Sequence, residues 1–219
     1  MFEDGARMKQ ELGEDKVFDF SLGNPCLDPP AAYLEALREE LREPRPGRYA
    51  YMPNAGYPET RAAVAATLRE RRGTPLEAQH IVMTCGAAGG LNVVLKTLLN
   101  PGEEVLILAP FFPEYVFYVG NHGGVARIVE TKQDFSLSLD EIEQAISAQT
   151  RAILVNSPNN PTGRMYDEPS LMRLGELLER AGKKHGTDIY LISDEPYGEL
   201  VFDGAELPNL FSCYRRTIL

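Results

Sequence analysis

Residues 151–163 read R-A-I-L-V-N-S-P-N-N-P-T-G, a short apolar run followed directly by a polar loop. The β-branched apolar run 151–155 is typical of a strand buried in a parallel sheet. The loop 156–163 then leaves the sheet at the carboxyl end of a strand, where open α/β sheets bind ligands. Prolines and a glycine restrict its shape, and its asparagines supply amide donors and acceptors. Because ordinary turns use the same residue types, the loop alone leaves both interpretations open.

A second apolar run also ends in polar residues. Residues 188–193 read D-I-Y-L-I-S and are followed by Asp194, Glu195, Pro196 and Tyr197. An aspartate at the mouth of a buried strand is costly to desolvate unless a cation or several donors meet it. Asp194 is therefore either a turn or cap residue, or the partner of a positively charged ligand group.

Apolar runs and amphipathic segments alternate along the chain, which predicts an α/β fold. We expect a three-layer arrangement, a mostly parallel sheet with helices on both faces. A break at 44–47 (P-R-P-G) separates residues 1–45 from residues 46–219. The expected strands are 81–84, 105–109, 126–130, 151–155 and 188–193, and the expected helices are 28–42, 58–72, 86–98, 139–147 and 170–184.

Composition excludes several classes of protein. The chain has 219 residues and a net charge of -10, which opposes binding to nucleic acid or to anionic membranes. Three cysteines without paired spacing predict reduced thiols in a cytoplasmic protein, and the histidines lack the spacing of a metal site. Residues 1–14 mix charges and do not form a secretory signal. The longest apolar run, 105–112, is far shorter than the roughly 20 residues of a membrane span.

The two strand-end motifs together resemble those of a known family. N-S-P-N-N-P-T-G (156–163) and S-D-E-P-Y (193–197) resemble the motifs of fold-type I, pyridoxal-phosphate-dependent aminotransferases of class I/II. The resemblance runs from about Phe18 to the last residue. It implies an aspartate aminotransferase-like large domain, incomplete, in residues 46–219, and it assigns residues 1–45 to the small domain. It also implies pyridoxal 5'-phosphate as cofactor, an amino acid and a 2-keto acid as substrates, and a homodimer.

The resemblance assigns roles around the cofactor ring. Asp194 would pair with the protonated ring nitrogen, and Asn160 and Tyr197 would both bond the phenolic oxygen of the ring. Asn160 would also orient the substrate carboxylate. Phe112, within P-F-F-P-E-Y (110–115), would lie flat on the ring. Ordinary core packing is the alternative for this phenylalanine.

A glycine-rich helix start is the expected phosphate cradle. Gly86, Ala87 and Ala88 open the segment G-A-A-G-G, whose small residues let an anion approach free backbone N–H groups. The segment has neither a Walker lysine nor the G-x-G-x-x-G spacing. Simple close packing is the alternative. Since the alanines offer only amides, further groups must contribute to phosphate affinity.

Two expected contacts lie in the N-terminal part of the chain. Tyr51, in Y-M-P-N-A-G-Y-P (51–58), matches the family tyrosine that reaches the cofactor phosphate of the neighbouring subunit. Gly23 matches a glycine whose backbone lies near the substrate carboxylate. Loop packing and a turn glycine are the respective alternatives.

Two expected residues are missing. The family holds its cofactor through a Schiff-base lysine some tens of residues after the Asp194 position, but residues 195–219 contain no lysine. The arginine that grips the substrate carboxylate has no counterpart either. We therefore expect a truncated aminotransferase that binds its cofactor weakly and is inactive by itself. A decarboxylase or carbon–sulfur lyase on the same scaffold, or a non-catalytic remnant of the fold, remains an alternative.

Overall fold

The computed structural model describes residues 2–18, 23, 27–42, 44 and 46–219, and it divides the chain into two compact units, 1–51 and 52–219. The N-terminal unit contains the helices α1 (Phe2–Leu12), η1 (Glu14–Lys16) and α2 (Ala31–Arg42). Its division from the second unit lies a few residues after the break predicted at 44–47. The assignment of residues 1–45 to a small domain stays a prediction.

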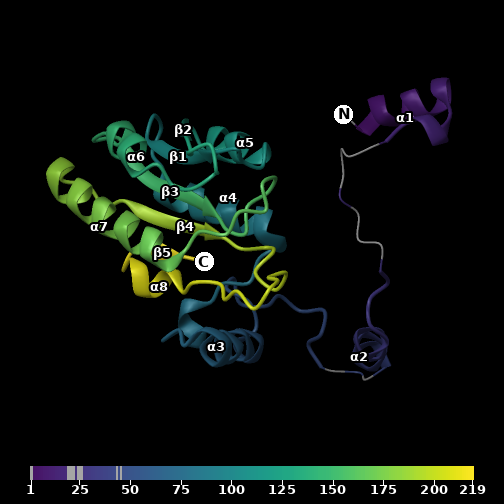
Figure 1. The fold of residues 1–219 in the computed structure, drawn as a ribbon. Coiled ribbons are helices and arrows are strands. Elements are labelled where there is room, and N and C mark those ends of the chain that lie inside the picture. Colours follow the sequence, from purple (N-terminus) through teal and green to yellow (C-terminus); the bar gives the residue numbers. More distant parts are fainter. Residues whose placement is uncertain (1, 19–22, 24–26, 43, 45) are drawn as a thin grey trace. The chain divides into compact units, whose positions relative to one another are not determined.

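The second unit is built on a parallel sheet of five strands, in the order β2-β1-β3-β4-β5 (Figure 1). The register places Asn156 beside Asp194 at the carboxyl ends of β3 and β4. The two polar strand ends predicted from the sequence therefore meet at one edge of the sheet. The strands are β1 (Glu104–Ala109), β2 (Val125–Glu130), β3 (Thr150–Asn156), β4 (Tyr190–Asp194) and β5 (Thr217–Ile218).

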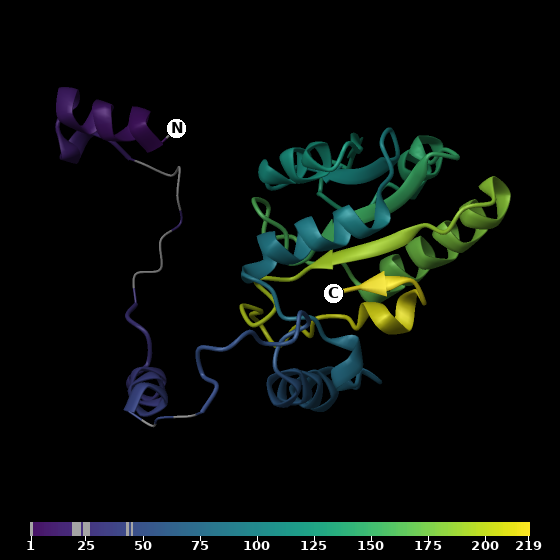
Figure 2. The same cartoon turned by 180° about the vertical axis from the view of Figure 1, so that it is seen from behind.

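Helices cover both faces of this sheet, as Figures 1 and 2 show from opposite sides. Successive strand residues point to opposite faces, so Leu191 packs in one core and Ile192 in the other. The three-layer α/β prediction is confirmed. One face carries α4 (Gly86–Leu98) and α5 (Glu114–Asn121), and the other carries α6 (Leu139–Ala145), α7 (Glu168–His185) and α8 (Leu210–Cys213).

Helix α7 shows how the sequence sets these elements. The Asp167 side chain accepts a hydrogen bond from the backbone N–H of Ser170, and Gly186 ends the helix in the left-handed conformation (φ 66°). Between them a leucine stripe, including Leu171, Leu174 and Leu178, is fully buried. Each such side chain contributes about 1.5 to 3 kcal/mol by burial. No helix in the part of the chain described above is long and apolar enough to cross a membrane.

The strand predicted at 81–84 is wrong. The short helix η2 (Ala78–His80) precedes this segment, which begins with extended backbone at Ile81 (φ -103°, ψ 132°) but is not assigned to a strand. Its Met83 N–H donates to the carbonyl of Ala55, which belongs to a loop before α3 (Pro58–Arg72). The apolar pattern indicated extended backbone correctly, but a strand also requires a neighbouring ladder of hydrogen bonds.

Candidate functional site

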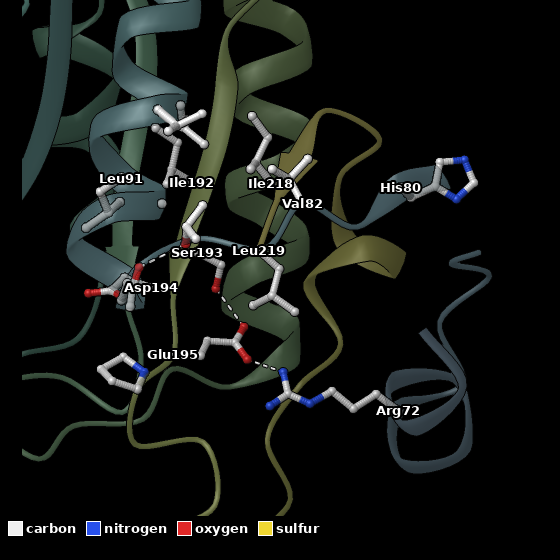
Figure 3. A pocket seen from close by; sticks show the side chains of 17 residues that line it. Arg72, His80, Val82, Leu91, Ile192, Ser193, Asp194, Glu195, Ile218 and Leu219 are labelled. Atoms are coloured by element: carbon white, nitrogen blue, oxygen red, sulfur yellow. Dashed lines mark hydrogen bonds and ion pairs between the residues drawn. The ribbon is translucent and has the colours of Figure 1, made fainter. Parts of the chain in front are cut away.

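Two cavities meet at the carboxyl ends of β3 and β4. The smaller, about 270 Å³, is lined together by six residues predicted from the sequence: Ala87, Ala88, Phe112, Asn160, Asp194 and Tyr197. The larger, about 490 Å³, is drawn in Figure 3 and includes Gly86 in its wall. Asp194 lines both cavities. The structure therefore brings seven of the nine predicted site residues to these two cavities.

Asp194 is the nearly buried acid of this site. It is the last residue of β4 and is 9% exposed. The Tyr115 hydroxyl donates to Asp194 Oδ2 at 2.5 Å, and within the described residues no other side chain hydrogen-bonds this carboxylate. Burial raises the pKa of Asp194, and the hydrogen bond from Tyr115 opposes that rise. Such a carboxylate lacks a full set of partners, which a cation in the cavity would complete.

Tyr115 was not assigned a role from the sequence. It lies in the first turn of α5 and its side chain is 1% exposed. Burial and the adjacent Asp194 carboxylate both raise the pKa of Tyr115, so its hydroxyl remains a donor. Phe112 packs edge-to-face against it, with ring centroids 5.6 Å apart and an interplanar angle of 80°. Tyr115 thus connects the aromatic wall of the cavity to its acid.

Asn156 ties the two strand ends together. Its Nδ2 donates to the backbone carbonyl of Asp194 at 2.8 Å, and its Oδ1 accepts from the N–H of Asn160 at 2.7 Å. The side chain is 4% exposed, so these bonds replace water at a buried amide. The position of Asn156 at the end of an apolar run was the available signal for this role.

The rest of the loop is closed on itself. Asn159 Oδ1 accepts from both the N–H and the hydroxyl of Thr162, at 3.1 and 2.9 Å, and Asn159 Nδ2 donates to the carbonyl of Pro110 at 3.3 Å. Gly163 donates its N–H to the Asn159 carbonyl and has φ 70°, where glycine is unstrained. Asn156 and Asn159 therefore hold the loop, and Asn156 and Asn160 line the cavity.

Asn160 and Tyr197 approach each other across this cavity. Asn160 Nδ2 lies 3.5 Å from the Tyr197 hydroxyl, a long and weak hydrogen bond. Tyr197 belongs to a turn in which the Gly198 N–H donates to the Glu195 carbonyl at 3.1 Å. The two polar groups are therefore close enough to bind one oxygen atom between them.

The first turn of α4 contributes backbone N–H groups. Ala87 and Ala88 line the smaller cavity, and Cys85, at the N-cap, makes no side-chain hydrogen bond to this turn among the described residues. The first N–H groups of a helix have no partner within the helix, and its dipole places about +0.5 charge there. A Cβ at Gly90 would lie 3.3 Å from Thr84 Oγ1, so this helix start packs closely. The arrangement suits an anion.

Tyr118 and Glu114 complete the smaller cavity and were not predicted. The Tyr118 hydroxyl donates to the Glu114 carboxylate, one helical turn away in α5. Burial and this carboxylate raise the pKa of Tyr118 to about 12. The spacing of Glu114, Tyr115 and Tyr118 along a helix was the available signal.

Gly23 and Tyr51 lie in the other unit, whose placement relative to the cavities is not determined. Tyr51 is fully exposed within its own unit, and a Cβ at Gly23 would contact nothing within 4 Å. Their expected roles stay predictions.

Comparison with known proteins agrees with this geometry. A model of the family "Aminotransferase class I and II" matches residues 15–214. The chain belongs to the class I and II aminotransferases. The family resemblance noted in the two strand-end motifs is thereby confirmed.

Related aminotransferases are about twice as long as this chain. It is 35% identical to the "Probable aspartate/prephenate aminotransferase" of Aquifex aeolicus, over 90% of the chain and 48% of that protein. It is 36% identical to the "Aspartate/prephenate aminotransferase" of Thermus thermophilus, over 83% of the chain and 46% of that protein. The chain thus spans about half the length of these relatives.

Solved aminotransferase structures share the fold. A crystal structure of an aminotransferase from Eubacterium rectale superposes with a TM-score of 0.93 at 35% identity, covering 99% of this chain and 55% of that one. Thermus thermophilus aspartate aminotransferase with maleate gives a TM-score of 0.82 at 32% identity, covering 98% and 55%.

Proposed function

We propose that this chain is the cofactor-binding part of a pyridoxal-phosphate-dependent aminotransferase, which moves an amino group between an amino acid and a 2-keto acid. Family membership and the printed names of its relatives support this function. The observation that carries it is Asp194, a nearly buried carboxylate with one hydrogen-bond donor that faces a cavity beside a helix N-terminus.

The donor set fits pyridoxal 5'-phosphate. Asp194 would accept a hydrogen bond from the protonated ring nitrogen, and Phe112 would lie against the ring. The backbone N–H groups of Ala87 and Ala88 would donate hydrogen bonds to the phosphate. When bound, this cofactor supplies an electron sink for the charge left as the α-proton departs. Asp194 would keep the ring nitrogen protonated, because loss of one charge from a buried ion pair leaves the other unpaired and costs about 3 to 5 kcal/mol.

Asn160 and Tyr197 would hold the opposite side of the ring. Their 3.5 Å separation supports a shared contact with the phenolic oxygen of the ring. Two donors at that oxygen stabilise its anionic form. Asn160 would also orient the substrate carboxylate, together with the backbone of Gly23.

The phosphate end of the site would be completed by a second copy of the chain. The Gly86 N–H donates to the Thr84 carbonyl at 3.0 Å, so Ala87 and Ala88 would offer the free backbone amides, and none of the three residues has a charged side chain. Tyr51, exposed on its own unit, would supply a further donor to the phosphate of a neighbouring subunit in a homodimer. The placement of residues 1–45 in a small domain and a cytoplasmic location belong to the same proposal.

The chain by itself would bind the cofactor weakly and would not turn over. Residues 195–219 contain no lysine to carry the proton between the reacting carbons.

Cofactor titration followed by chemical trapping tests this function. The 219-residue chain is titrated with pyridoxal 5'-phosphate by absorbance, reduced with borohydride and digested for mass spectrometry. We expect saturable binding at one site, no lysine-linked adduct and no transamination of a keto acid. A stoichiometric adduct at one lysine would contradict the proposed inactivity, and absence of saturable binding would contradict the cofactor assignment.

A further inference from the structure

A largely buried ion pair in the wall of the larger cavity anchors the backbone that carries Asp194. Arg72, at the end of α3, pairs through Nη1 with Glu195 Oε2. The Glu195 side chain is 5% exposed and that of Arg72 is 18% exposed. The Ser193 hydroxyl donates to the other carboxylate oxygen, Oε1, at 2.6 Å. Both oxygens of Glu195 are therefore occupied, as the dashed lines in Figure 3 show.

The backbone at Arg72 is held in place at the end of α3. Asn209 Nδ2 donates to the backbone carbonyl of Arg72 at 3.0 Å, and Gly73 ends α3 in the left-handed conformation. A Cβ at Gly198 would lie 2.8 Å from Arg72 Nη2 and 3.1 Å from Leu207 Cδ2. Glycine at this position therefore allows the guanidinium to pack against the backbone of the turn.

Glu195 lies between two residues of the cavity. Asp194 precedes it, and its own carbonyl closes the turn that carries Tyr197. Ser193 and Glu195 point to the side opposite Asp194, and Figure 3 shows the Asp194 carboxylate directed away from Arg72. Fixing Glu195 therefore fixes the direction of Asp194 and the start of the turn at the same time.

The Arg72–Glu195 ion pair is better suited to fixing the conformation of the turn after β4 than to stabilising the folded chain. Desolvation of two buried charges offsets much of their attraction, and well-packed apolar replacements are often equally stable. The bonds from Arg72 and Ser193 are directional, whereas an apolar pair would leave the orientation of the turn less defined.

We propose that Arg72 is a positioning residue of the cofactor site. Through Glu195 it holds residues 194–198 in the conformation that presents Asp194 and Tyr197 to the cavity. This inference rests on the proposed function, because the ligand it serves is pyridoxal 5'-phosphate.

The chain offers a matched control on the same helix. Arg71 Nη1 pairs with Glu199 Oε1 at 2.6 Å, but the two side chains are 58% and 74% exposed. Exposed pairs of this kind contribute little to stability. Arg71→Met therefore removes the same charge from the neighbouring position without touching the buried anchor.

The test measures cofactor affinity, amide hydrogen exchange without cofactor and thermal unfolding for four variants of the 219-residue chain. They are Arg72→Met, Arg72→Lys, Arg71→Met and the double variant Arg72→Met/Glu195→Met. We expect Arg72→Met to weaken cofactor binding about tenfold, the lower end of the cost of losing a residue that orients ligand groups at metal sites. We also expect it to speed amide exchange at Gly198. Arg72→Lys should recover part of the affinity, and Arg71→Met should behave as wild type.

The double variant separates positioning from stability. We expect it to unfold at nearly the wild-type temperature, since no charge is left unpaired, yet to bind the cofactor as weakly as Arg72→Met. If the double variant recovers wild-type cofactor affinity as well as wild-type thermal stability, the inference is overturned. Equal cofactor affinities of Arg72→Met and Arg71→Met would overturn it too. If the wild-type chain shows no saturable binding, the proposed function fails and the inference fails with it. If the wild-type chain binds the cofactor and the variants bind it equally well, the inference fails but the proposed function stands.

Discussion

Replacing Tyr115 with phenylalanine tests whether the Tyr115 hydroxyl stabilises the ionised carboxylate of Asp194. The change removes one hydroxyl, whose bond to Asp194 Oδ2 is 2.5 Å long, and keeps the ring that packs against Phe112. A hydrogen bond to a charged group contributes about 1.5 to 3 kcal/mol. Because Asp194 lines a cavity that water can enter, we expect a loss of stability at the lower end of that range.

The loss should depend on pH with a defined sign. Burial raises the pKa of Asp194 in the folded chain above its unfolded value, and the Tyr115 hydroxyl limits this rise. The stability associated with a raised carboxyl pKa is complete below the unfolded pKa and is lost as pH increases through the folded pKa. Tyr115→Phe raises the folded pKa further, so its deficit should be small in acid and should grow as Asp194 ionises.

Urea unfolding at a series of pH values measures this deficit, and Tyr118→Phe is the matched control. Tyr118 donates to the exposed Glu114, so its replacement should lower stability by less than about 1 kcal/mol. A Tyr115→Phe deficit that is the same at every pH, or no larger than that of Tyr118→Phe, would refute the reasoning.

Two further substitutions test the packing of α7 against α8 and the hydrogen bonds by which Asn156 links the ends of β3 and β4. Gly175→Ala would place a Cβ 2.2 Å from the Cys213 carbonyl, so we expect about 1 to 3 kcal/mol of destabilisation in thermal unfolding. Gly120→Ala is the control and should be neutral or stabilising, because no atom lies within 4 Å of its Cβ. Equal effects of the two substitutions would contradict the packing of α7 against α8. Asn156→Ala removes the hydrogen bonds to the Asp194 carbonyl and the Asn160 N–H. We expect it to lose about 1 to 3 kcal/mol of stability and to bind the cofactor more weakly. Unchanged stability and cofactor affinity would show that Asn156 does not hold the two strand ends together.

Much of the fold follows from patterns that are local in the sequence. The buried strands β1, β3 and β4 coincide with short apolar runs, and α7 coincides with a leucine stripe between a cap and a glycine. The segment 81–84 shows the limit of this approach, because pairing depends on a neighbour that no local pattern reveals. Helix α8, with only four residues, is too short to give a periodic signal.

The candidate site was predictable where polar residues follow a strand. Asp194 ends one strand and Asn160 follows the neighbouring parallel strand, so the sheet edge brings them together. The role of Tyr115 was not predictable, because it lies 79 residues from Asp194 in the sequence and meets it only through the packing of α5. The Arg72–Glu195 pair, 123 residues apart, depends on tertiary packing in the same way.

Cofactor affinity of Asp194→Asn tests the central claim most directly. The change keeps the shape of the side chain and removes its charge, and the exposed Asp203, replaced in the same way, is the control. If Asp194 pairs with a ring cation, a loss of about 3 kcal/mol weakens pyridoxal 5'-phosphate binding by about a hundredfold relative to wild type and to Asp203→Asn. Equal affinities of all three proteins would contradict the account.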